Sequence, residues 1–137
     1  MSRIAHILLT LWAGGLWTIC GIVAPSLFAL LGRQTAGEVV GHFFAIGAWG
    51  GLGIGVVLFA LTRTPVWSHH RGAVPVLIGV SAAAPVVSEI VLGPLMHQAR
   101  IAGETQRFAV LHGLGGVLFL IACLGTLTLV WKVSRAR

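Results

Sequence analysis

The sequence has too few charged residues for a protein that folds in water. Only 9% of its 137 residues are Asp, Glu, Lys or Arg, and only three residues are acidic. Soluble domains carry about 25% charged residues. Because 57% of the residues are apolar, the polar side chains cannot cover a water-soluble globule. We therefore expect the solvent of this chain to be lipid.

The basic excess does not indicate nucleic-acid binding. The formal net charge is +6, but the Lys and Arg residues lie mainly at the ends of apolar segments. A nucleic-acid-binding protein would gather them on one face. We interpret the charge as a signal of membrane topology, and expect the lipid bilayer rather than nucleic acid as a partner.

Catalytic motifs and closely spaced metal ligands are also missing. The sequence contains no GxSxG, Walker or dinucleotide-binding motif, and no HxxxH or CxxC spacing. These absences favour a protein that is not an enzyme. The two cysteines, Cys20 and Cys123, lie in separate apolar segments, where we expect free thiols. A disulfide or a metal pair would require that their helices meet.

Four apolar segments are present, at residues 4–31, 39–61, 73–96 and 108–131. A helix needs about 20 residues to cross about 30 Å of hydrocarbon, and each segment is long enough. The connections between them are short, which makes neighbouring helices antiparallel. The sequence therefore predicts an all-α integral membrane bundle of four antiparallel transmembrane helices. We expect one domain over residues 1–137, with no internal repeat.

The distribution of Lys and Arg predicts the orientation of this bundle. The segments on the side of the two termini contain six cationic residues: Arg3, Arg63, Arg71, Lys132, Arg135 and Arg137. The two connections on the opposite side contain three: Arg33, Arg100 and Arg107. Because cytoplasmic segments are richer in Lys and Arg, we expect both termini in the cytoplasm.

Three glycines of the second segment share one helix face. Gly47, Gly51 and Gly55 are spaced four residues apart, and such a face permits the close approach of another helix. The neighbour is either another helix of the same chain or a partner, in a homo-oligomer or a membrane complex. The spacing alone does not choose between these alternatives.

Glu89 is the only charged residue between Arg71 and Arg100. A carboxylate in hydrocarbon is costly, so it needs a partner, a bound proton or a function. In the predicted orientation Glu89 lies about 10 Å from the outer end of its helix. Two histidines enter the same half of the bilayer on the second and fourth helices. The sequence therefore predicts a polar site of His42, Glu89 and His112, shaped by Pro25, Phe28 and Pro94.

This set of residues is compatible with several kinds of chemistry. A carboxylate with histidines can relay protons or bind a cationic solute. The same three side chains could hold a transition metal, and two histidines on different helices could ligate haem. Alternatively, Glu89 only ties helices together, either protonated or paired with a histidine or Arg100.

Short motifs in a fixed order resemble those of the bacterial members of the transmembrane protein 205-like group. These are small four-helix membrane proteins long classed as a domain of unknown function. The resemblance covers nearly the whole chain, and the Phe-x3-His-Gly pattern that starts at Phe108 matches best. The other matching pieces are His6, Trp12 to Trp17, Ala24 to Phe28, Ala36-Gly37, Gly41 to Phe44, Glu89 and Gly93-Pro94.

The resemblance implies four spans, an integral membrane location and no established enzymatic activity. We expect the chain in the bacterial inner membrane. Animal relatives are associated with platinum-drug resistance, which hints at the handling of metals or solutes; this chain lacks their long insert between the third and fourth spans. A weaker likeness, through the histidines, is to copper-resistance and haem-binding four-helix proteins. The positions that match the family pattern are Pro25, Phe28, Phe44, Glu89, Pro94, Phe108 and His112.

Overall fold

The computed structural model describes residues 3–64 and 72–135, and these residues form four helical spans without a strand. Each span is long and apolar enough to cross a membrane. This confirms the prediction of an all-α bundle of four transmembrane helices. The spans are, in order, α1 (Arg3–Thr18) with η1 (Ile19–Val23) and α2 (Ala24–Leu30); α3 (Arg33–Thr62); α4 (Ala73–Val87) with η3 (Ser88–Leu92) and α5 (Gly93–Ile101); and α6 (Thr105–Arg135).

The helices extend beyond the apolar segments of the sequence. Residues 33–38 and 97–101, which we expected in connections, are helical. Hydropathy marks the hydrocarbon, whereas backbone hydrogen bonds continue the helix into the polar interface. The turn after α5 is correspondingly short. It is closed by bonds from the Gly103 N–H to the Arg100 carbonyl and from the Glu104 N–H to the Ala99 carbonyl, with Gly103 at φ 71°.

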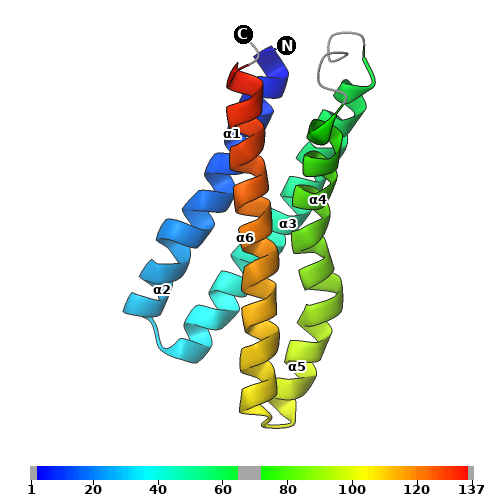
Figure 1. The fold of residues 1–137 in the computed structure, drawn as a ribbon. Coiled ribbons are helices and arrows are strands. Elements are labelled where there is room, and N and C mark those ends of the chain that lie inside the picture. The colour runs from blue at the N-terminus through cyan, green and yellow to red at the C-terminus, as the bar shows by residue number, and fades with distance from the viewer. Residues whose placement is uncertain (1–2, 65–71, 136–137) are drawn as a thin grey trace.

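The four spans form a ring in which each packs against its neighbours in sequence. α3 packs against α1 and α4, and α6 closes the ring by packing against both α4 and α1. Both chain ends lie at one end of the bundle, and the turns after α2 and α5 lie at the other (Figure 1). We call α1, α4, residues 48–62 of α3 and residues 119–135 of α6 the terminal half. The turn half comprises η1, α2, η3, α5, residues 33–47 of α3 and residues 105–118 of α6.

Nearly all of the core lies in the terminal half. The buried side chains there include Leu9, Trp12, Leu16, Leu58, Ile78, Phe119 and Leu129. In the turn half, the buried residues among those that the structure describes are Ala36, Val40 and Ala99. Apolar side chains gain little by leaving lipid, so helix association in a membrane depends on close packing. The terminal half therefore holds the bundle together.

The glycine face of α3 packs against other helices of the same chain. A Cβ atom at Gly51 would lie 2.6 Å from Trp12 Nε1, and one at Gly55 would lie 2.7 Å from Ala82 Cβ. A Cβ atom at Gly47 would lie 3.2 Å from Ile19 Cδ1. The face is thus covered by α1, η1 and α4. Gly51 and Gly55 are buried in this packing, and Gly47 is half-buried.

A serine and a glycine interlock at the contact between α4 and α6. The Ser81 side chain is buried, and a Cβ atom at Gly125 would collide with its hydroxyl oxygen. That oxygen has no hydrogen-bond partner among the described residues. The missing side chain of Gly125 therefore makes the room in which Ser81 lies, and the two helices approach closely at this level.

Candidate functional site

Two π-helical segments interrupt the first and third spans. They are η1 and η3, each of five residues. Each is closed by a backbone bond over five residues, from the Ala24 N–H to the Ile19 carbonyl and from the Gly93 N–H to the Ser88 carbonyl. A proline follows directly in both spans, at Pro25 and Pro94. The first and third spans therefore share one local design, although we expected no internal repeat.

The prolines account for the π-turns. A proline ring lacks the N–H donor and collides with the carbonyl four residues earlier in a regular α-helix. A wider turn just before the ring relieves that collision while the helix continues. The sequence signal was present, as Ile22-Val23-Ala24-Pro25 and Val91-Leu92-Gly93-Pro94. Pro25 and Pro94 were predicted to shape the polar site, and each of them follows a π-turn.

Beyond the π-segments the bundle divides into two hairpins. α2 packs along α3, and α5 packs along α6. The two pairs diverge toward the turn end, where the α2–α3 turn stands well apart from the α5–α6 turn (Figure 1). No residue of α2 is buried, and Ala99 is the one buried residue of α5. The predicted polar residues lie on this divided part of the bundle.

Glu89 is the second residue of η3, and its side chain is half-buried. It makes no hydrogen bond or ion pair with another residue that the structure describes. It lies two helical turns after Ala82, which packs against α3 at Gly55. At the level of Glu89 the third span packs against α6, where Ser88 Oγ would lie 3.0 Å from a Cβ atom at Gly115.

The two predicted histidine partners are exposed. His42 lies on α3, and His112 lies on α6, where its ring stacks on Phe108 with centroids 6.0 Å apart. No bond joins either to Glu89. Within residues 3–64 and 72–135, no group of three or more His, Cys, Asp and Glu side chains could hold a metal ion. The structure does not assemble the three-ligand metal set that the sequence allowed. Of the shaping residues, Pro25, Phe28 and Pro94 are all exposed.

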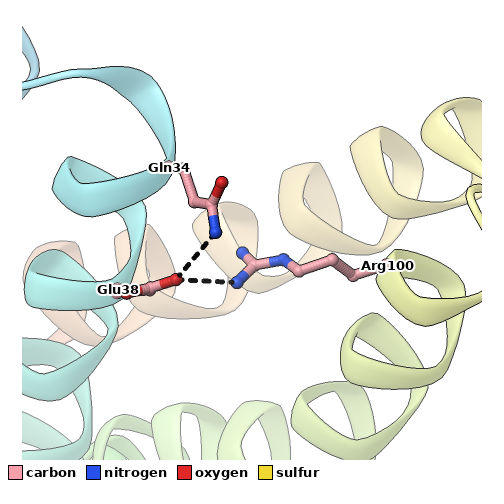
Figure 2. A network of polar contacts seen from close by, with 3 residues as sticks. All are labelled: Gln34, Glu38 and Arg100. Carbon is pink, nitrogen blue, oxygen red and sulfur yellow. Dashed lines mark hydrogen bonds and ion pairs between the residues drawn. The ribbon is translucent and has the colours of Figure 1, made fainter.

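An ion pair bridges the two hairpins at the turn end. Arg100 Nη1 of α5 lies 3.9 Å from Glu38 Oε1 of α3, and Gln34 Nε2 donates to the same oxygen at 3.4 Å (Figure 2). The Arg100 guanidinium also lies 5.0 Å from the centre of the Phe108 ring. Arg100 is thus the partner of Glu38 and not of Glu89, which corrects one of our alternatives. Glu38 is not among the predicted site residues, because residues 33–38 were expected in a connection.

The Glu38–Arg100 ion pair contributes little to the free energy of folding, although it connects the two hairpins. The Glu38 and Arg100 side chains are 56% and 46% exposed, and exposed ion pairs contribute about 0–1 kcal/mol. The cation–π contact to Phe108 adds about 0.5–1 kcal/mol at an exposed site. A contact of this size can hold two hairpins near each other without fixing their separation.

The fold and these side chains define a four-helix membrane bundle with a divided polar end. Residues 7–105 match a family described as a domain of unknown function (DUF4149), and the chain belongs to that family. The matched region includes both π-segments, Glu38, His42, Glu89 and Arg100, and ends where α6 begins. No curated protein and no solved structure matches the chain.

Proposed function

We propose that this chain is a membrane protein without a catalytic centre that responds to protons or cationic solutes through Glu89. One observation carries the proposal. Glu89 is a half-buried carboxyl group inside an apolar span, it lies in a π-turn, and it has no hydrogen-bond or ion-pair partner among the described residues. Ionisable groups inside membranes usually mark pathways or binding sites, and π-turns occur frequently at functional sites.

The absence of such a partner within the described chain argues against a purely structural role. A carboxyl group that ties helices together has to bond to the neighbouring helix, as Glu38 does with Arg100. The protonated and ionised forms of Glu89 instead differ in their free energy within an apolar span. The neutral acid is tolerated next to hydrocarbon, whereas the carboxylate requires water or a cation. Its charge state is therefore coupled to the separation of the two hairpins.

The surrounding residues have supporting roles in this proposal. Pro25 and Pro94 impose the π-turns, and Phe28 follows Pro25 as an exposed residue of α2. His42 and His112, on the two opposite hairpins, exchange protons between Glu89 and the aqueous phase, since an imidazole ring can both accept and donate a proton. The Glu38–Arg100 pair limits how far the hairpins part.

We further propose a bacterial inner-membrane location with both termini in the cytoplasm, so that the turn half faces outward. The Lys and Arg distribution supports this orientation, although two of the counted residues, Arg71 and Arg137, lie outside the described residues. The resemblance to the transmembrane protein 205-like group supports the location. Reporter fusions test the orientation. A fluorescent protein fused after residue 137 should fluoresce, and alkaline phosphatase inserted in the turn at residues 102–104 should be active.

Infrared difference spectra between low and high pH test the role of Glu89. The wild-type protein in lipid should show a carboxyl band that disappears in Glu89→Gln. Glu104→Gln is the matched control, because Glu104 is exposed and pairs with Arg107 at 3.0 Å in the turn after α5. Its spectrum should keep the band. If Glu89→Gln leaves the difference spectrum unchanged, Glu89 does not titrate and the proposal fails.

A further inference from the structure

The two cysteines, far apart in sequence, meet inside the bundle. Cys20 lies in η1 and Cys123 in α6, and their sulfur atoms are 3.8 Å apart. Both are free thiols. The helices of the two cysteines do meet, which is the condition that the sequence left open. At this separation the Cys123 thiol donates a hydrogen bond to Cys20 Sγ, whereas the S–S bond of a disulfide is about 2.0 Å long.

Neighbouring contacts hold the first and fourth spans in register at this level. Trp17, one turn before Cys20, donates its indole N–H to the Cys123 carbonyl at 3.2 Å. The Thr126 hydroxyl donates to the same carbonyl at 3.0 Å. No residue of the segment that carries Cys20 is fully buried, and Cys20 itself packs at the edge of the core. Bond formation therefore needs a side-chain rotation and a small backbone adjustment, not a rearrangement of helices.

We propose that Cys20 and Cys123 are a redox-active thiol pair that closes to a disulfide between the first and fourth spans. Closure breaks two S–H bonds, forms one S–S bond and releases two electrons and two protons. Both cysteines lie within apolar spans, so the oxidant has to be soluble in lipid. It also has to accept both electrons and both protons. A quinone, which is reduced to the quinol, belongs to this chemical class.

The unequal burial of the two thiols assigns their order of reaction. Cys20 is half-buried and Cys123 is fully buried, so the quinone reaches Cys20 first. The Cys20 sulfur loses its proton and adds to the quinone ring. Cys123 then loses its proton and attacks the Cys20 sulfur, and the electron pair of the sulfur–ring bond leaves with the ring. With the two released protons, the ring becomes the quinol.

Thiol counting in the purified full-length protein tests the proposal. The protein in lipid vesicles is treated with a short-chain quinone, denatured and alkylated, and its mass is measured. We expect the wild type to lose both alkylation sites and two hydrogen atoms while forming one quinol per chain. Dithiothreitol should restore both sites. The wild type keeping two alkylatable thiols, under conditions in which the quinone oxidises free dithiothreitol, would overturn the proposal.

Three variants make this result specific. Cys20→Ser should keep its Cys123 thiol alkylatable, whereas Cys123→Ala should retain the ring as a covalent adduct on Cys20, because no second thiol displaces it. Neither variant should release quinol; either variant releasing as much quinol as the wild type would contradict the pair. In the double variant Cys20→Ala with Gly21→Cys, the thiol moves to a position with no atom within 4 Å of a Cβ. This variant should form no disulfide and release no quinol, and dithiothreitol should restore no alkylation site. The infrared band of Glu89 should persist in Cys20→Ala with Cys123→Ala, which separates this proposal from the proposed function.

Discussion

The terminal half and the turn half both consist mostly of apolar residues but are packed differently. In the terminal half, glycines and alanines admit large or polar neighbours, as Gly51 admits Trp12 and Gly125 admits Ser81. In the turn half, π-turns precede Pro25 and Pro94, and the same kinds of apolar side chains stay exposed. In lipid, hydrophobicity does not decide which residues are buried. The positions of small residues and prolines decide it.

The difference assigns separate tasks to the two ends of one bundle. The terminal half fixes the four spans relative to one another. The turn half places its polar side chains on two hairpins that few contacts hold together. Substitutions in the first half should change stability, and those in the second should change hairpin separation and proton binding.

The largest effect should come from filling the glycine face of the terminal half. Gly51→Leu places a side chain where even a Cβ atom is 2.6 Å from Trp12 Nε1, and should lower the free energy of unfolding by at least about 3 kcal/mol. Gly53→Leu is the matched control, with no atom within 4 Å of its Cβ, and should unfold like the wild type or slightly later. Circular dichroism during titration with sodium dodecyl sulfate measures both. Equal unfolding midpoints for the two variants would show that the two faces of α3 do not differ in packing.

Truncation of a leucine should separate the two halves directly. Leu58, in the terminal half, is 1% exposed, and Leu58→Ala should cost about 2–5 kcal/mol through lost packing and a cavity. Leu30, in α2, is 81% exposed, and Leu30→Ala should stay within about 0.5 kcal/mol of the wild type. The same titration compares them. A large cost at Leu30 would show that the turn half is packed after all.

The contact between α4 and α6 should show strong coupling between two small residues. Gly125→Ala should cost about 1–3 kcal/mol because the new methyl group meets the Ser81 hydroxyl. Ser81→Ala alone should be nearly neutral, since the hydroxyl has no partner among the described residues. Together they should restore most of the loss, because the two Cβ atoms would then lie 3.4 Å apart. Additive costs in this double-mutant cycle would contradict the interlock.

The smallest change in stability should come from the bridge at the turn end. Arg100→Gln removes an exposed ion pair and should cost at most about 1 kcal/mol, yet it should lengthen the distance between the hairpins. Arg107→Gln is the control, because Arg107 pairs with Glu104 within one turn and does not bridge the hairpins. Spin labels at Thr35 and Ile101 report the distance by pulsed electron paramagnetic resonance. High salt should mimic Arg100→Gln, and an unchanged distance would exclude the bridge as a restraint.

The sequence was sufficient to predict the four transmembrane spans, since long apolar segments with short connections allow few other folds. It also located Glu89, because a single charge stands out in an apolar segment. It could not show that Glu89 lacks the expected partners. Whether His42, His112 or Arg100 reaches it depends on helix rotation and on the π-turns, which periodicity does not specify. The Glu38–Arg100 pair was missed for a related reason, because helices continue through polar residues that hydropathy assigns to loops.

One distance measurement tests the central claim that the charge of Glu89 controls the turn half alone. In a background with Cys20→Ala and Cys123→Ala, one spin-label pair is placed at Thr35 and Ile101 and another at Ile4 and Val76, all on exposed side chains. The turn-half distance should be longer at high pH, where Glu89 is a carboxylate, and the terminal-half distance should not change. Glu89→Gln should hold the turn-half pair at its shorter distance at every pH. A turn-half distance that ignores pH, or that changes equally in Glu89→Gln, would contradict the claim.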